Sequence, residues 1–325
     1  MQMAWGYVPP LAIEAALRNR VFDVLDAGPM TLEQVHAATG ASARGLRAVM
    51  NLLVGLELLR KDAEGRYALT PESSSFLVST RPSFQGGLLK HTSEQLLPKY
   101  LQMNRIVATG EPATAVNQQS DGSEFFLQFV EDIFPMSYGP ARVLANHLEL
   151  ADGRPTRVLD LAAGSGVWGI ALAQSSDAVT VTAVDWAGVM PATRRVTGRF
   201  GLADRYTYVE GDLLQAEFGS GHTVATLGHI LHSEGEERSR MLLAKTFAAL
   251  APGGTIAIAE FLVNPERTGP VGGLIFAVNM LVNTDVGDTF SFEEISSWLR
   301  EAGFTDVRQL ESPGPSPLIL ATKPA

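Results

Sequence analysis

The stretch Arg157-Val-Leu-Asp160-Leu-Ala-Ala-Gly164-Ser-Gly166-Val-Trp-Gly169-Ile-Ala-Leu-Ala-Gln174 decides the fold. An apolar run ends in an acid, passes through a glycine-rich loop and enters an Ala/Leu-rich helical run. A second apolar run follows and also ends in an acid, Asp185. This order predicts a βαβ unit that holds a nucleoside, because the glycines admit a close ligand and the helix start directs N–H groups toward it. Asp185 can accept both hydroxyls of a ribose.

The segment Gly164-Ser-Gly166-Val-Trp-Gly169 also fits the G-x-G-x-x-G pattern of nicotinamide and flavin proteins, but such a match alone is weak. Asp160 favours another ligand, because a carboxylate ahead of the loop can hold a cationic amine. The segment Asp160–Gly166 resembles motif I (D/E-x-G-x-G-x-G) of class I S-adenosylmethionine-dependent methyltransferases, with Ala162 at the first glycine. A cofactor-free βαβ unit is the alternative. The resemblance assigns S-adenosylmethionine binding to Asp160, Gly164, Gly166, Asp185 and Trp186.

Length and composition set limits on the function. The 325 residues suffice for two domains, and 46% hydrophobic with 18% charged residues indicates a well-packed globular chain. The net charge of −10 argues against nucleic-acid and anionic-membrane partners. Without cysteine there are no disulfides or thiolate metal sites, and no metal is expected from the His and Asp spacing. With no signal peptide or long apolar span in view, we expect a cytoplasmic enzyme.

The first 90 residues predict a winged helix. A helical apolar pattern over residues 11–27 stops at Gly28-Pro29, Thr31 and Gln34 form a capping box, and Ser42 can cap a third helix. Two short apolar runs then flank the turn at residues 62–65, which indicates a β-hairpin.

A winged helix raises the hypothesis of a DNA-binding regulator. Residues 1–90 contain nine Lys/Arg and eight Asp/Glu, so no basic stripe for phosphates emerges. In small-molecule O-methyltransferases, which the chain also resembles, such a domain is a dimerisation arm. The resemblance therefore implies a homodimer, and the apolar residues Trp5, Tyr7, Val8 and Leu11 form either its contact or plain core.

Two further regions complete the expected organisation. Residues 91–152 have a mostly helical pattern that includes the aromatic run 125–134, and in the resembled family this layer closes over the substrate; ordinary core packing is the alternative. Residues 153–325 form the Rossmann-like cofactor domain. We thus expect an α/β protein with a winged-helix dimerisation domain at 1–90, a helical cap at 91–152 and a catalytic domain at 153–325.

A third acid, Asp212, follows the strand pattern at residues 206–210. Acids at three successive strand ends share the carboxyl edge of an open parallel sheet, where such sheets bind ligands. A turn-forming role for Asp212 is the alternative. In the resembled family the residue matching Asp212 recognises the adenine amino group, and Leu213 lies beside the ring.

The catalytic residues are implied by a second motif. His232 after the fourth strand and Glu260 after the fifth resemble the L-H-D-W and L-x-P-G-G-x-(apolar)-E segments of small-molecule O-methyltransferases. The resemblance makes His232 the general base and Glu260 the residue that orients it, with Met280 and Asn283 lining the substrate. The sequence departs from the pattern at Ser233-Glu234, which replace Asp-Trp, and at Thr289, which replaces a second glutamate with Asp288 one step away.

The function expected from these features is methyl transfer from S-adenosylmethionine to a hydroxyl of a small aromatic or polyketide-like molecule. One alternative is an enzyme of the same fold that binds the cofactor but catalyses decarboxylation, hydroxylation or a pericyclic reaction. A DNA-binding regulator is the alternative from another functional class.

Overall fold

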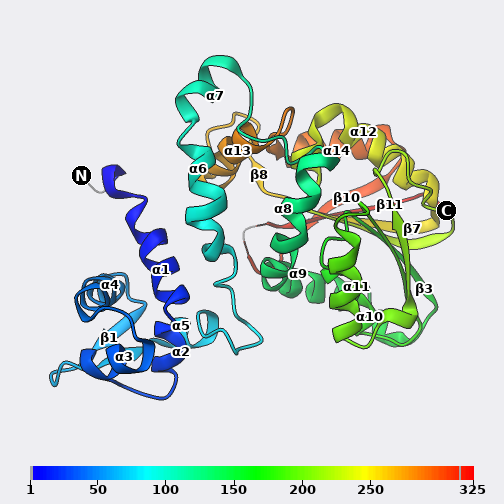
Figure 1. The fold of residues 1–325 in the computed structure, drawn as a ribbon. Helices are drawn as coiled ribbons and strands as arrows, with labels where there is room; N and C mark the ends of the chain where they lie inside the picture. Colours follow the sequence, from blue (N-terminus) through cyan, green and yellow to red (C-terminus); the bar gives the residue numbers. More distant parts are fainter. Residues whose placement is uncertain (1–2, 315) are drawn as a thin grey trace. The chain divides into compact units, whose positions relative to one another are not determined.

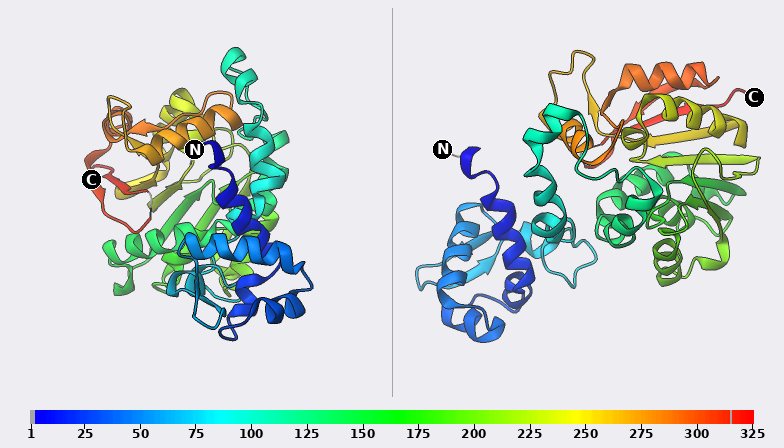
Figure 2. Two further views of the ribbon diagram at one scale, coloured as in Figure 1. Left: turned by 90° about the vertical axis from the view of Figure 1, so that its left-hand side faces the viewer. Right: turned by 45° about the horizontal axis from the view of Figure 1, so that its top comes forward.

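The computed structural model describes residues 3–314 and 316–325, and the chain forms two compact units, Met1–Leu101 and Gln102–Ala325 (Figures 1 and 2). Each unit has its own hydrophobic core and is described by itself. The finer three-part division at residues 90 and 152 stays a proposal.

The N-terminal unit contains the three-helix and hairpin pattern expected of a winged helix. The capping box of Thr31 and Gln34 is confirmed, with bonds of 3.3 and 2.8 Å, and the hairpin strands pair antiparallel with Leu59 opposite Leu69. The helical pattern over residues 11–27 is two helices, because Arg20 adopts a left-handed φ of 58°. The elements are η1 (Met3–Trp5), α1 (Val8–Arg18), α2 (Val21–Leu25), α3 (Leu32–Thr39), α4 (Ala43–Gly55), β1 (Leu59–Lys61), β2 (Tyr67–Leu69), α5 (Pro71–Phe76), η2 (Leu88–His91), η3 (Thr92–Leu96) and α6 (Leu97–Tyr100).

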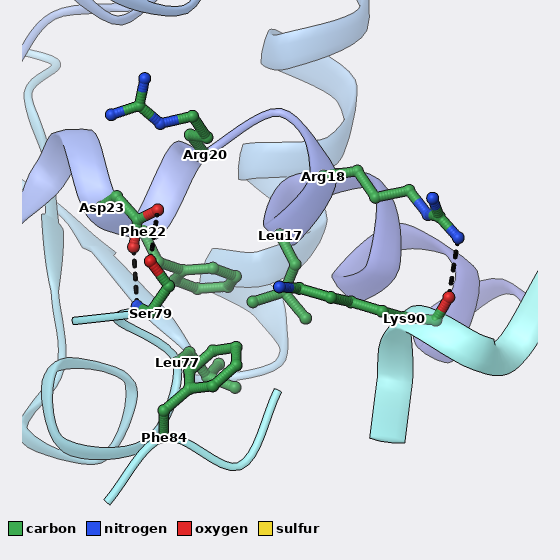
Figure 3. A pocket seen from close by; sticks show the side chains of 9 residues that line it. All are labelled: Leu17, Arg18, Arg20, Phe22, Asp23, Leu77, Ser79, Phe84 and Lys90. Atoms are coloured by element: carbon green, nitrogen blue, oxygen red, sulfur yellow. Dashed lines mark hydrogen bonds between the residues drawn. The ribbon is translucent and has the colours of Figure 1, made fainter. Parts of the chain in front are cut away.

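A hollow of about 470 Å³ lies in this unit, between α1, α2 and the segment 77–90 (Figure 3). The carboxylate of Asp23 accepts hydrogen bonds from the Ser79 amide at 2.7 Å and its hydroxyl at 3.0 Å. Arg18 donates to the Lys90 carbonyl at 2.8 Å, and the Lys90 ammonium lies 5.1 Å from the centre of the Phe84 ring. These polar groups therefore tie the first two helices to the chain that follows the hairpin.

The C-terminal unit is built on a seven-stranded sheet of order β10-β11-β7-β6-β3-β4-β5. Strands β3 to β7 run parallel, and β11 pairs antiparallel with both β7 and β10. The strand order reverses direction between β3 and β6: β4 and β5 lie on one side of β3, and β6 and β7 lie on the other. At such a switch point the loops after the strands diverge and leave room for a ligand. The strands are β3 (Thr156–Leu161), β4 (Val179–Asp185), β5 (Tyr206–Glu210), β6 (His222–Gly228), β7 (Leu250–Ala259), β10 (Thr305–Leu310) and β11 (Leu318–Thr322).

Helices cover both faces of this sheet (Figures 1 and 2). Alternate residues of β3 show the two layers: Val158 packs with α9 and α10, while Leu159 and Leu161 pack with α12 and α14. The expected α/β Rossmann-like class is confirmed. The remaining elements are α7 (Met103–Thr109), α8 (Gln119–Asp132), α9 (Phe134–His147), η4 (Leu150–Asp152), α10 (Val167–Ala173), α11 (Met190–Arg199), η5 (Ala203–Arg205), α12 (Leu231–Ala249), β8 (Leu262–Val263), α13 (Val271–Asn283), β9 (Phe290–Ser291) and α14 (Phe292–Glu301).

Helix α12 is interrupted near its start. It begins at Leu231 and is broken at Gly235, which has φ 72° and ψ 175°. A Cβ at Gly235 would lie 2.7 Å from the Val286 carbonyl oxygen, so a loop packs directly against the break. Within the residues that the structure describes, no helix combines the length and apolar character needed to cross a bilayer.

The loop between β3 and α10 has an unusual backbone. Ala162, Gly164 and Gly166 have φ values of 51°, 54° and 76°, all in the left-handed region. Glycine tolerates this region, whereas an L-residue such as Ala162 is strained there by about 1–2 kcal/mol. Ala162 thus occupies a glycine position and keeps the glycine conformation.

Ala162→Gly should raise the free energy of unfolding by about 0.5–1 kcal/mol, because relief of the left-handed strain exceeds the entropy cost of glycine. Ala163→Gly is the matched control: this buried neighbour lacks a positive φ, so its replacement should lower stability by about 1 kcal/mol. Urea unfolding of both variants measures the difference, and equal destabilisation by the two changes would contradict the strain argument.

Candidate active site

Asp160 at the end of β3 is fully buried and its two carboxylate oxygens bind inside the protein. One accepts from the Thr226 hydroxyl of β6 at 2.7 Å, and the other from the Gly169 amide of α10 at 3.0 Å. Burial raises the pKa of this carboxyl to about 7, although the two hydrogen bonds act to lower it. The negative charge of Asp160 is therefore weakly compensated and lies directly behind the glycine loop.

Asp185 at the end of β4 holds the loop from the other side. Its carboxylate accepts from the Gly164 amide and from the Trp186 amide, each at 2.7 Å. Burial raises the pKa of Asp185 to about 6, and no cation forms an ion pair with it among the described residues. Gly164 itself cannot be replaced without strain, since a Cβ would meet Val130 at 3.3 Å.

Asp212 and Leu213 follow β5, the next strand of the sheet. The Asp212 carboxylate accepts from the Leu214 amide at 2.9 Å and from Arg238 at 2.7 Å. Leu213 is buried, while the Asp212 side chain keeps 23% of its exposure. Trp186 lies beside α8, with its ring 6.3 Å from that of Phe126.

The three acids thus end three adjacent parallel strands, as the sequence indicated. This arrangement fits S-adenosylmethionine: Asp185 is a carboxylate without a cationic partner among the described residues, suited to ribose hydroxyls, and the loop ahead of α10 carries no large side chain at Gly164 or Gly166. The buried charge of Asp160 favours a cationic ligand nearby.

His232 and Glu260 form a buried pair. His232 Nδ1 lies 2.7 Å from Glu260 Oε2, and the His232 amide donates to Oε1 at 3.3 Å. Burial opposes ionisation of Glu260, but the charge and hydrogen bonds of His232 lower the pKa of this carboxyl below its ordinary value. Within the described residues Nε2 of His232 makes no hydrogen bond, so this nitrogen remains able to accept a proton.

Three aromatic rings surround His232, and the sequence had not indicated a role for two of them, Phe261 and Phe276. The Phe276 ring of α13 meets the His232 ring edge-on at 4.8 Å and stacks on Phe261 at 4.0 Å. His229 packs against Phe261 at 5.1 Å, binds the Ser316 hydroxyl through Nε2 at 2.9 Å, and has a pKa lowered by burial to about 4. Two features of the sequence could have indicated these rings: Phe261 directly follows Glu260, and Phe276 lies one helical turn before Met280.

The expected substrate residues lie on the same helix as Phe276. Met280 and Asn283 are each 5% exposed, and the Asn283 amide donates to Asn279 at 3.0 Å. The residues at the second family glutamate have other side-chain partners: buried Thr289 donates to the Gly273 carbonyl at 3.4 Å, and the Asp288 carboxylate lies 3.5 Å from Arg267. In the part of the chain that the structure describes, Glu260 alone hydrogen-bonds that ring.

Comparison with known protein families agrees with this geometry. Residues 127–305 match the O-methyltransferase domain, and residues 1–79 match the O-methyltransferase dimerisation domain. The first match covers more than half of the chain and includes the three strand-end acids, His232 and Glu260.

Similar proteins span nearly the whole chain. The 3-hydroxy-5-methyl-1-naphthoate 3-O-methyltransferase of Streptomyces sahachiroi is 29% identical, with 99% of this chain and 94% of the relative covered. The tetracenomycin polyketide synthesis 8-O-methyl transferase of Streptomyces glaucescens is 25% identical, with 100% and 96% covered. A crystal structure of a candidate O-methyltransferase from Nostoc punctiforme has a TM-score of 0.90 and 27% identity, with 99% and 97% covered.

These relatives are named for O-methylation, which disfavours both the non-methylating chemistries and the DNA-binding alternative. The fold, the strand-end acids, the histidine–glutamate pair and the two domain matches lead to one conclusion. The chain belongs to the O-methyltransferase family of S-adenosylmethionine-dependent enzymes.

Proposed function

We propose that this enzyme methylates a hydroxyl of a small aromatic or polyketide-like acceptor, with His232 as the general base. The observation that carries the proposal is the His232–Glu260 pair at 2.7 Å inside a group of aromatic rings. Flat rings such as Phe261 and Phe276 favour a planar acceptor through stacking and edge contacts. The naphthoate and tetracenomycin names of the two relatives support the same acceptor class.

The proposed base works by simple proton transfer. Nε2 of His232 takes the hydroxyl proton of the acceptor, and neutral histidine suits this task near neutral pH. The Glu260 carboxylate fixes the ring through Nδ1 and stabilises the imidazolium that forms, as its 2.7 Å contact and lowered pKa indicate. Met280 and Asn283 are proposed to line the acceptor beside the Phe276 ring.

The cofactor site is proposed to use the strand-end acids. When bound, S-adenosylmethionine supplies an electrophilic methyl group on a sulfonium. Asp185 accepts from the ribose hydroxyls, and Asp212 receives the adenine amino group with Leu213 beside the ring. Trp186 and the loop that contains Gly164 and Gly166 complete the site. Both carboxylate oxygens of Asp160 accept hydrogen bonds from Thr226 and Gly169. Asp160 is therefore proposed to attract the cationic amine through its negative charge and to keep the glycine loop in position.

His232→Ala should lower methyl transfer by about 10²–10⁴-fold, the range for loss of a general base. A panel of hydroxynaphthoates, naphthols and hydroxyanthraquinones is assayed by S-adenosylhomocysteine release and by product mass. Calorimetry should show unchanged S-adenosylhomocysteine binding, since His232 lies outside the acids that hold the cofactor. Glu260→Gln should cause a smaller loss.

Full activity of His232→Ala would exclude this histidine as the base. A product without an added methyl group would instead refute the proposed reaction. If the wild type binds S-adenosylhomocysteine but methylates no compound of the panel, the proposed acceptor class is wrong.

Asp185→Asn should weaken S-adenosylhomocysteine binding by about 1.5–3 kcal/mol, because charged hydrogen bonds to the ribose are lost. The ribose hydroxyls favour ionised Asp185, whose pKa in the free enzyme is about 6. Affinity should therefore be full above about pH 6 and fall below it, and the variant should lose this part of the pH dependence. Calorimetry between about pH 5 and 8 measures both effects. Glu210→Gln, opposite Asp185 in the neighbouring strand, is the control that should change neither.

We also propose a homodimer that works in the cytoplasm without nucleic-acid or membrane partners. Its support is the dimerisation domain match at residues 1–79, the net charge of −10, and the exposure of Trp5 at 61% and Tyr7 at 52%. Exposed aromatic side chains of this size are typical of protein interfaces.

Light scattering at micromolar concentration should give the mass of two chains. Trp5→Asp should shift the protein toward monomer, because a charge in an apolar interface is costly. Met241→Asp, at a side chain 45% exposed on α12, is the matched control and should leave the dimer intact. A monomeric wild type, or a Trp5 variant that dimerises as tightly as the wild type, would contradict the proposed contact.

A further inference from the structure

Two cations of α12 hold the loop that follows β5. Arg238 Nη2 donates to Asp212 Oδ2 at 2.7 Å, and Lys245 Nζ donates to the carbonyls of Leu213 and Ala216 at 2.8 and 2.6 Å. Arg238 and Lys245 are seven residues apart, which places them on the same side of the helix. One helix thus holds the loop proposed to recognise adenine both at the Asp212 side chain and at the backbone carbonyls of Leu213 and Ala216.

Arg238 has a second acidic partner in Glu234. Arg238 Nε donates to Glu234 Oε2 at 2.6 Å, and Glu234 is only 5% exposed. Burial raises the pKa of the Glu234 carboxyl, while the charge of Arg238 opposes this rise. Glu234 lies two residues after His232, in the short turn that ends at the Gly235 break. One guanidinium therefore connects the loop of Asp212 to the turn of His232.

The geometry suits arginine and not lysine. The guanidinium donates to two acids through two different N–H groups. Because the group is planar, the directions of both hydrogen bonds are fixed relative to each other. Asp212 is held at both oxygens, since Oδ1 accepts from the Leu214 amide while Oδ2 accepts from Arg238. The rotation of this carboxylate is thereby set before any ligand arrives, which saves the ordering cost on binding.

We propose that Arg238 is a positioning residue of the cofactor site, which orients Asp212 for the adenine amino group. The inference rests on the proposed contact of Asp212 with adenine. It also explains the departure at Ser233-Glu234 from the Asp-Trp pattern: Glu234 supplies the buried second acid that holds the guanidinium in place.

Calorimetric titration with S-adenosylhomocysteine tests the proposal without any acceptor. Arg238→Met should weaken binding about tenfold, the scale of one charged hydrogen bond. It should also lower stability to urea, because Glu234 is left buried and unpaired. Adding Glu234→Gln should restore the stability but not the affinity. Arg238→Lys, which reaches a single acid, should give an intermediate loss.

Arg240→Met is the matched control. Arg240 lies two residues further along α12 and pairs with Glu236 and Glu301 at the surface, so its loss should leave the affinity unchanged. Wild-type affinity in the Arg238→Met, Glu234→Gln variant would show a merely structural role and overturn the proposal.

A double-mutant cycle separates this inference from the proposed adenine contact. If Arg238 acts through Asp212, Arg238→Met should cause little further loss of affinity in an Asp212→Asn background. Additive losses would overturn the positioning role while leaving the adenine contact intact. An Asp212→Asn variant with wild-type affinity would instead refute the adenine contact itself, and the inference with it.

Discussion

The buried carboxylate of Asp160 is the interaction on which the architecture of the site depends. It ends β3, accepts from Thr226 of β6 and accepts from Gly169 of α10, so three elements meet at one charge. A Cβ at Gly169 would lie 3.1 Å from this carboxylate and 2.8 Å from Val181, so only a bare backbone allows α10 to approach so closely. The glycine loop must then bend sharply between β3 and α10. The left-handed conformations of Ala162, Gly164 and Gly166 follow from this short connection.

Charge is distributed unequally among the three strand-end acids, and this difference matches their proposed roles. Asp160 and Asp185 have raised pKa values because burial is compensated only by neutral N–H and O–H donors. Asp212 instead bonds to a guanidinium. The carboxylates nearest the loop therefore favour a cationic or hydroxyl-bearing ligand, which relieves their desolvation. Asp212, proposed to contact adenine, is already paired with the cation of Arg238, which fixes the direction of its carboxylate.

Local pattern was sufficient to predict the sheet, the glycine loop and the positions of the strand-end acids, because strand ends and turns depend on nearby residues. Three-dimensional contacts determine what could not be predicted. The break of α12 at Gly235 depends on the loop at Val286, which is distant in sequence. The rings of Phe261 and Phe276 meet His232 only because β7 and α13 are brought together in the fold. The replacement of Asp-Trp by Ser233-Glu234 was visible in the sequence, but the bond from Arg238 to Asp212, 26 residues away, required the structure.

The Gly235 break also determines how His232, the proposed base, is held. Had α12 continued straight through residue 235, the orientation of His232 would follow from the axis of a long helix. Because Gly235 leaves the helical conformation, the turn of residues 231–234 is positioned by its own tertiary contacts. The Glu260 carboxylate holds the His232 amide and ring, the His232 carbonyl accepts from the Asp288 amide at 2.9 Å, and Arg238 holds Glu234. Since Arg238 also binds Asp212, it connects the turn that carries the proposed base to the loop that carries the proposed adenine contact. A displacement of either segment would therefore strain the hydrogen bonds of the same guanidinium.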